Sequence, residues 1–181
     1  GEGSGAVVAN DPDTKRARMM IHRTRQLNTP SLVVTAVPGQ AFPLLTREGR
    51  DVHFDRVLCD VPCSGDGTLR KSFYALGRWK INHAINLHLL QLQLLKRSLA
   101  LVKVGGVVVY STCSINPLEN EAVIAQALSE SNGAVVLRQA SLSGLRSAEG
   151  LTAWGVPDTN DLSKLYASFD DIPPSKSQKK K

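Results

Sequence analysis

Two cysteines in this chain stand where a thiol can do chemistry. Cys63 and Cys113 each follow closely on an apolar run that is typical of a strand. In open α/β sheets ligands bind beyond the carboxyl ends of the strands, and a thiol near a strand end and a helix start can be activated as a thiolate. The alternative is that each is a small buried residue. Cys59 lies inside the first run, so we expect it in the core.

A carboxylate stands in a similar position earlier in the chain. Asp11 follows the apolar run 6–9 and precedes Pro12. A carboxylate that ends a strand and leads into a helix can accept hydrogen bonds from both hydroxyls of a nucleoside ribose. An aspartate before proline is also a common helix N-cap, and Asp13 is expected at the surface. The residues alone leave both roles open for Asp11.

Basic side chains follow Cys63 at short range. They could hold phosphate groups there, and they are Arg70, Lys71, Arg78 and Lys80. Trp79 stands among them and is either a stacking platform for a base or, more commonly, a core residue.

Alternating strands and helices are predicted to position these residues. Apolar runs predict strands over 6–9, 31–35, 56–60, 107–112 and 134–137. Capping residues and helical periodicity predict a first helix that has Pro12 at its first position and runs to about Leu27. They predict a second helix over 81–101, with an apolar stripe at Ile85, Leu89, Leu92, Leu95 and Leu99. A third helix is predicted from Asn116 onward, with Val123 and Ala127 facing inward, where Glu119 would complete the cap. Residues 38–53 are expected to form a loop. This order indicates an α/β fold with a mostly parallel sheet, flanking helices and strands covered on both faces.

The composition sets limits on the class of protein. A chain of 181 residues with 42% hydrophobic residues can bury one sizeable core. Its formal charge of +6 favours a polyanionic partner. Three cysteines without a regular spacing favour a reducing, intracellular compartment. We find no long apolar run or secretory signal and expect no membrane partner and no metal site.

Two long motifs carry a resemblance to a known family. Residues 54–71, FDRVLCDVPCSGDGTLRK, and residues 109–121, VYSTCSINPLENE, resemble the Sun-type (NSUN) RNA cytosine-5 methyltransferases. The phrase CDVPCSGDGT most resembles their eukaryotic tRNA (cytosine-5-)-methyltransferase branch. The resemblance extends from about residue 5 to residue 137. It implies a Rossmann-like fold that binds S-adenosylmethionine, and an RNA substrate, most plainly tRNA.

The resemblance also implies roles for individual residues. Cys113 would add to C6 of the target cytosine, which makes C5 nucleophilic towards the methyl group of S-adenosylmethionine. Cys63 would assist loss of the C5 proton and release of the enzyme. Asp60 would hydrogen-bond the base near N3 and the exocyclic amine, and Asp60, Pro62 and Asp11 would line the cofactor site, with Asp11 on the ribose.

The sequence also departs from the family pattern. The glycine-rich cofactor loop and the strand before it are not present, and Thr35 stands where the family usually has an aspartate for the adenine. We therefore expect residues 1–140 to be a partial catalytic domain. Residues 141–181 would be a poorly defined segment with a disordered basic tail, Lys176 and Lys179 to Lys181.

These departures bear on activity. The chain alone is expected to methylate poorly and to need the rest of its own chain or a completing partner. The alternative is a degenerate RNA-binding or scaffold module, against which the two retained thiols argue. The branch implies a nuclear or nucleolar location, with the cytoplasm left open.

Overall fold

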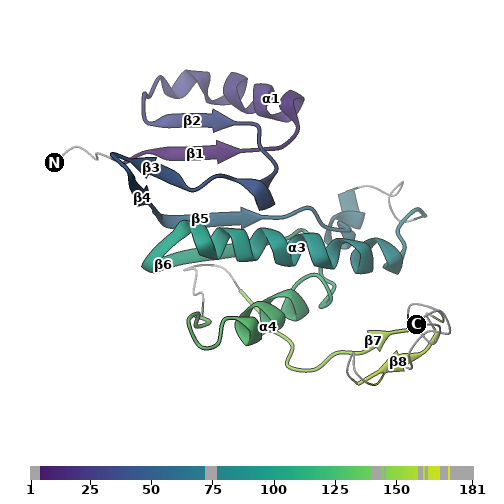
Figure 1. The fold of residues 1–181 in the computed structure, drawn as a ribbon. Coiled ribbons are helices and arrows are strands. Elements are labelled where there is room, and N and C mark those ends of the chain that lie inside the picture. Colours follow the sequence, from purple (N-terminus) through teal and green to yellow (C-terminus); the bar gives the residue numbers. More distant parts are fainter. Residues whose placement is uncertain are drawn as a thin grey trace, which may run out of the picture. The chain divides into compact units, whose positions relative to one another are not determined.

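The computed structural model describes residues 5–71, 77–139, 144, 146–158, 161, 163–167 and 171. The chain divides into two compact units, the first made of residues 1–59 and 93–109 and the second of residues 60–92 and 110–181. Figure 1 shows their elements in chain order.

A parallel strand pair with its crossover helix opens the first unit. Strand β1, Val7–Asn10, pairs in parallel with β2, Leu32–Thr35, so that Asn10 lies opposite Thr35. Helix α1, Thr14–Thr24, joins them and ends in a 3₁₀ turn, Arg25–Leu27 (Figure 1). Parallel neighbours need such a crossover connection. The strands predicted here are confirmed, and so is the helix, which begins two residues later than predicted.

A hairpin occupies the segment that was expected to be a loop. After a 3₁₀ turn, Gly39–Ala41, strand β3, Leu45–Arg47, pairs antiparallel with β4, Arg50–Val52. The two turn residues, Glu48 and Gly49, have φ values of 53° and 75°. Positive φ at both positions is the feature of a type I′ hairpin turn. The loop prediction was wrong, because glutamate rarely adopts this conformation and does not signal the turn.

Two further strands, one before and one after the long helix in the sequence, pair with each other. Strand β5, Phe54–Asp60, pairs with β6, Val102–Ser111, and α3, Ile81–Leu101, lies between them in the sequence. The predicted strand 56–60 and helix 81–101 are confirmed. Strand β6 begins earlier than predicted and includes Gly105 and Gly106. A Cβ at Gly106 would lie 2.9 Å from the carbonyl oxygen of Asp55, so this glycine permits close approach of the backbones rather than ending the helix.

The strands are not covered on both faces as predicted. Burial alternates at the end of β5, where Cys59 is 7% exposed and Leu58 is 71% exposed, and Val33 of β2 is 50% exposed. Alternation is the period of a strand with one covered face. The expectation that Cys59 is a core residue is confirmed.

The buried stripe of α3 differs from the predicted one. Leu92 and Leu95 are buried as expected, but Leu89 is 63% exposed. Gln91, with no exposed surface, and Ser98 are buried on this helix instead. The predicted stripe contained only apolar residues, whereas the buried face of α3 also includes the polar residues Gln91 and Ser98.

Helix α4 begins later than predicted, at Glu121, and ends at Glu130. Residues 117–120 form a turn, and the side-chain oxygen of Asn116 accepts a hydrogen bond from the backbone N–H of Leu118 at 3.0 Å. An Asx turn of this kind competes with helix initiation. Val123 and Ala127 face inward as predicted, with exposures of 0% and 6%.

The region after α4 contains a short hairpin. The strand predicted over 134–137 is not formed, and Val136 and Leu137 are 76% and 73% exposed. Strand β7, Val156–Pro157, pairs antiparallel with β8, Leu165–Tyr166. The predicted basic tail, Lys176 and Lys179 to Lys181, lies outside the described residues. No helix in the described part of the chain combines the length and apolar character needed to cross a bilayer.

Candidate functional site

The structure brings the two predicted thiols together in the second unit. The Sγ atoms of Cys63 and Cys113 are 3.1 Å apart, and the backbone N–H of Cys113 points to the Cys63 sulfur at 3.3 Å. Cys63 is partly buried and Cys113 is exposed, and no disulfide joins them. The site therefore presents one accessible sulfur supported by a second, more sheltered one.

The environment of Cys63 favours its neutral form. Burial raises the pKa of the Cys63 thiol to about 11, and the neighbouring Cys113 thiol adds to this rise. Backbone N–H groups of Cys113 and Gly65 act in the opposite direction and do not overcome it. Because the nucleophilic form of cysteine is the thiolate, Cys63 is a poor nucleophile at neutral pH.

Two glycines let the loop after β5 approach the turn after β6. Gly65 has φ of 74°, and a Cβ at Gly67 would lie 2.7 Å from the carbonyl oxygen of Cys113. The N–H of Gly67 donates to that same oxygen at 3.1 Å. Thr68 closes the turn by donating its hydroxyl to the carbonyl of Gly65 at 2.7 Å. A side chain at position 67 would push the two cysteines' loops apart.

Further hydrogen bonds fix the residues around the thiols. The Ser111 hydroxyl donates to the Asp60 carboxylate at 2.9 Å, and the N–H of Ile115 donates to the Asp66 carboxylate at 2.8 Å. Asp60 is exposed, and so is Pro62, whose carbonyl accepts a hydrogen bond from the Gln91 amide at 2.9 Å. The predicted base-binding carboxylate is therefore oriented by its neighbour and open to solvent.

A buried carboxylate that the sequence did not reveal lies beneath the thiols. Glu119 has no exposed surface. It accepts hydrogen bonds from the Ser64 N–H at 2.8 Å, the Ser64 hydroxyl at 2.5 Å, the Ser114 hydroxyl at 2.7 Å and the Gln91 amide at 2.9 Å. The expected capping role of Glu119 was wrong. The available signal was that a serine directly follows each of the two cysteines.

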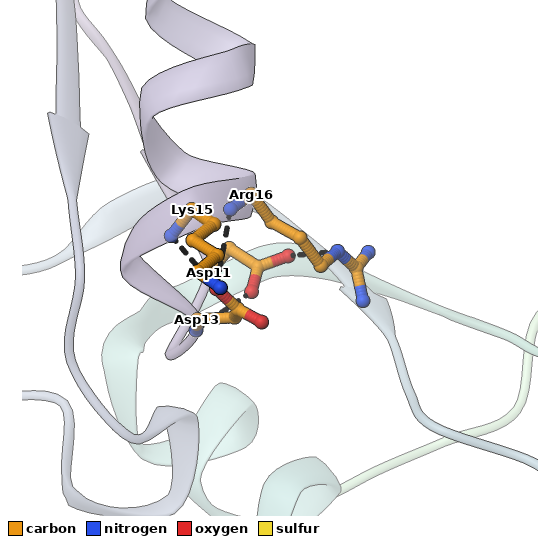
Figure 2. A network of polar contacts seen from close by, with 4 residues as sticks. All are labelled: Asp11, Asp13, Lys15 and Arg16. Atoms are coloured by element: carbon orange, nitrogen blue, oxygen red, sulfur yellow. Dashed lines mark hydrogen bonds and ion pairs between the residues drawn. The ribbon is translucent and has the colours of Figure 1, made fainter.

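Asp11 does not cap helix α1. Figure 2 shows that Asp13 is the N-cap, with its carboxylate accepting from the backbone N–H groups of Lys15 at 2.7 Å and Arg16 at 3.3 Å. The Asp11 carboxylate instead accepts from the N–H of Asp13 at 2.9 Å and pairs with the Arg16 guanidinium at 3.0 Å. Pro12 therefore precedes the cap and is not the first helical residue. Both aspartates have the right residue type, so spacing alone did not separate them.

The Asp11 carboxylate fits the role of a hydroxyl acceptor. A carboxylate has about four acceptor positions, and the described partners use two of them. The Asp11 side chain is 16% exposed, whereas the Arg16 side chain is 70% exposed, so the arginine can move away from the carboxylate into solvent. Asp11 belongs to the first unit, whereas both thiols belong to the second.

Asn10 and Thr35 tie the ends of β1 and β2 together. The Asn10 amide oxygen accepts from the Thr35 hydroxyl at 2.9 Å and from the N–H of Val37 at 3.0 Å, and its amide nitrogen donates to the Val37 carbonyl at 2.8 Å. Thr35, where the family usually has an aspartate, is thus engaged within its own sheet. No pattern in the sequence indicated this link.

The predicted RNA-binding residues lie at the surface of the second unit. Arg70 and Lys71 end a 3₁₀ turn, Asp66–Lys71, while Arg78 and Lys80 directly precede α3, and all are exposed. Trp79 is partly buried, and its Nε1 is buried without a hydrogen-bond partner in the described part of the chain. Their contacts with RNA stay predictions. Among the described residues, no group of three His, Cys, Asp or Glu side chains gathers as a metal site.

Comparisons with known proteins place the chain in a family. The family described as 16S rRNA methyltransferase RsmB/F matches residues 2–169. The tRNA (cytosine(34)-C(5))-methyltransferase of Drosophila melanogaster is 40% identical over 178 residues, 94% of this chain and 24% of that protein. The multisite-specific tRNA:(cytosine-C(5))-methyltransferase of Saccharomyces cerevisiae is 43% identical over 167 residues, 88% of this chain and 24% of that protein.

A solved structure supports the fold. The crystal structure of a methyltransferase homolog protein from Pyrococcus horikoshii matches with a TM-score of 0.53 and 31% identity, over 69% of this chain and 37% of that one. The predicted α/β, Rossmann-like methyltransferase fold and the resemblance to the Sun-type tRNA methyltransferases are confirmed. The chain spans about a quarter of the length of the two relatives. It belongs to the family of methyltransferases described as 16S rRNA methyltransferase RsmB/F.

Proposed function

We propose that this chain supplies the catalytic thiols of an enzyme that transfers a methyl group from S-adenosylmethionine to C5 of cytosine in tRNA. The observation that carries the proposal is the contact between Cys63 and Cys113, with their Sγ atoms 3.1 Å apart. The tRNA substrate is proposed from the two relatives, whose names give tRNA cytosine-C5 methylation.

Cys113 is the nucleophile in this proposal. Its sulfur is the exposed one of the pair, whereas the Cys63 thiol, with its pKa raised to about 11, stays protonated at neutral pH. Cytosine C5 becomes nucleophilic only when a bond at C6 turns the ring into an enamine, and thiolate addition at C6 does this. The target base must first leave its stack, as RNA bases do in loops or by flipping.

Cys63 and Asp60 assist the same reaction. Cys63 lies against the Cys113 sulfur and so is placed to assist loss of the C5 proton and release of the product. Water takes the C5 proton, the electrons of the C5–H bond restore the C5–C6 double bond, and the Cys113 sulfur leaves C6 as a thiolate that accepts a hydrogen bond from the protonated Cys63 thiol. The Asp60 carboxylate, oriented by the Ser111 hydroxyl, accepts a hydrogen bond from the exocyclic amine of the base. Both roles require only that the cytosine ring sits over the exposed Cys113 sulfur.

Asp11, Asp60 and Pro62 would hold S-adenosylmethionine, which supplies the methyl group when bound. The spare acceptor positions of the Asp11 carboxylate match two ribose hydroxyls. Arg70, Lys71, Arg78 and Lys80 would hold RNA phosphates, since exposed basic groups contribute affinity without sequence preference.

A trapped covalent complex tests this function. We define the chimera as the Saccharomyces cerevisiae relative with its matched region replaced by this chain, because the chain alone spans 24% of that protein and is proposed to methylate poorly. The Cys63→Ala chimera, incubated with tRNA and S-adenosylmethionine, should give a protein–RNA adduct on a denaturing gel. The adduct should vanish in Cys63→Ala/Cys113→Ala. An adduct that persists without Cys113, or RNA binding without any adduct or methylation, would favour the scaffold alternative.

A further inference from the structure

We propose that Glu119 is a positioning residue that holds the two thiols in contact. Its side chain has no exposed surface and takes no direct part in the chemistry described above. The proposal about geometry stands on the hydrogen bonds alone, and its catalytic consequence rests on the proposed function.

The hydrogen bonds of Glu119 reach the residue that directly follows each cysteine. Oε1 accepts from the Ser64 N–H at 2.8 Å, and Oε2 accepts from the Ser64 hydroxyl at 2.5 Å and the Ser114 hydroxyl at 2.7 Å. One oxygen, Oε2, therefore joins the loop after β5 to the turn after β6. Hydrogen bonds to a charged acceptor are about twice as strong as neutral ones.

The carboxylate is itself fixed from the helix side. The Gln91 amide nitrogen donates to Glu119 Oε1 at 2.9 Å and to the Pro62 carbonyl at 2.9 Å. Two acceptors determine which way this amide points, because its oxygen would be repelled there. The Tyr110 hydroxyl donates to the Glu119 carbonyl at 2.6 Å, and His88 bonds the Leu118 carbonyl at 2.7 Å. We call Glu119 with its hydrogen-bonded donors on Ser64, Ser114 and Gln91 the clamp. The backbone of the clamp at residues 118 and 119 is thus held by side chains of β6 and α3.

Removal of the carboxylate should separate the thiols. In Glu119→Ala the donors of Ser64, Ser114 and Gln91 lose a shared acceptor inside the protein, and a buried donor without a partner is destabilising. The loops can recover partners only by moving towards water. In Glu119→Gln the two serine hydroxyls can reverse and accept from the new amide, so the clamp should persist.

The proximity of the thiols can be measured without any substrate. In glutathione buffers, oxidised glutathione oxidises the two thiols to one disulfide and is itself reduced to two molecules of glutathione. The equilibrium constant, read by mass spectrometry of the full chain, should fall about 5-fold to 100-fold in Glu119→Ala, as expected for an unpaired buried donor. It should stay within about threefold of the unchanged protein in Glu119→Gln, since the hydrogen bonds are replaced.

A matched control uses the neighbouring carboxylate. Glu121 accepts a hydrogen bond from the N–H of Leu151 at 3.2 Å and does not contact either cysteine loop through any described hydrogen bond. Glu121→Ala should leave the thiol–disulfide equilibrium unchanged. An equilibrium in Glu119→Ala that matches both Glu121→Ala and the unchanged protein would overturn the proposal.

A milder variant covers the case in which Glu119→Ala does not fold. Ser114→Ala removes one hydroxyl of the clamp and keeps the carboxylate with its other donors. A folded Ser114→Ala chain, checked by circular dichroism, should show a smaller fall in the same equilibrium constant, and no fall would overturn the proposal.

The catalytic consequence has a separate measurement. In the chimera, Glu119→Ala should lower kcat with KM for tRNA unchanged, and Glu119→Gln should restore most of kcat. If the equilibrium shifts but the unchanged chimera forms no methylated RNA, the proposed function fails while the positioning role stands. If methylation proceeds and the equilibrium does not shift, the positioning role fails.

Discussion

The molecule holds two carboxylates near strand ends in opposite ways. Asp11, after β1, has a partly exposed side chain and is bound by one backbone N–H and an exposed arginine. Glu119, after β6, is fully buried and receives four hydrogen bonds from three residues. The first is available to a ligand, while the second is committed to holding two loops. The difference separates a binding carboxylate from a structural one.

The largest expected effect concerns the alkylation rate of Cys63 in the region held by Glu119. A pKa raised from 9.0 to about 11 leaves Cys63 about 100-fold less ionised at pH 8 than an ordinary thiol. Because alkylation requires the thiolate, the iodoacetamide rate at Cys63 should keep rising through pH 9 to 11. Peptide mass spectrometry across pH measures this rate. A plateau at or below pH 9 would show that the thiol is not sheltered.

A substitution in the loop after β5 should destabilise the same region through a steric clash. Gly67→Ala places a Cβ 2.7 Å from the Cys113 carbonyl oxygen, and overpacking of this kind costs about 1–3 kcal/mol. Urea unfolding should show that loss, together with a weaker thiol–disulfide equilibrium. The control is Gly77→Ala, which meets nothing within 4 Å and should leave both unchanged. Equal effects at the two glycines would contradict the close approach of the loops.

The smallest expected effects separate the two aspartates near α1. Asp13→Ala removes the N-cap of α1 and should cost about 1 kcal/mol in urea unfolding. Asp11→Ala removes an ion pair with an exposed arginine and one hydrogen bond from the Asp13 N–H, and it should cost less. It should, however, weaken S-adenosylmethionine binding to the chimera, measured by calorimetry. If Asp11→Ala lowered the free energy of unfolding more than Asp13→Ala, and Asp13→Ala weakened S-adenosylmethionine binding instead, the two roles would have to be exchanged.

Much of the local fold was predictable from the sequence. Apolar runs and helical spacing predicted β1, β2, β5, α1 and α3, because these elements follow their own periodicity. The hairpin was missed since its turn uses Glu48 at a positive φ of 53°. The strand after α4 was wrong because an apolar run such as 134–137 forms a strand only where a neighbour pairs with it.

The thiols of the site could be predicted, but their support could not. Two cysteine motifs at predicted strand ends indicate chemistry through residue type and position alone. The sequence does not indicate a buried role for Gln91 or Glu119, because a polar residue on a helix or turn usually faces solvent. Their burial depends on contacts between segments 28 residues apart in the sequence.

The most direct measurement compares methylation by the chimera with and without the Cys113 thiol. If Cys113 is the nucleophile, Cys113→Ala should lower the initial rate of methyl transfer to tRNA by at least about 1,000-fold, the scale expected for loss of a covalent nucleophile. Folding is checked in parallel by circular dichroism. Methylation that survives Cys113→Ala would contradict the assignment of the two thiols.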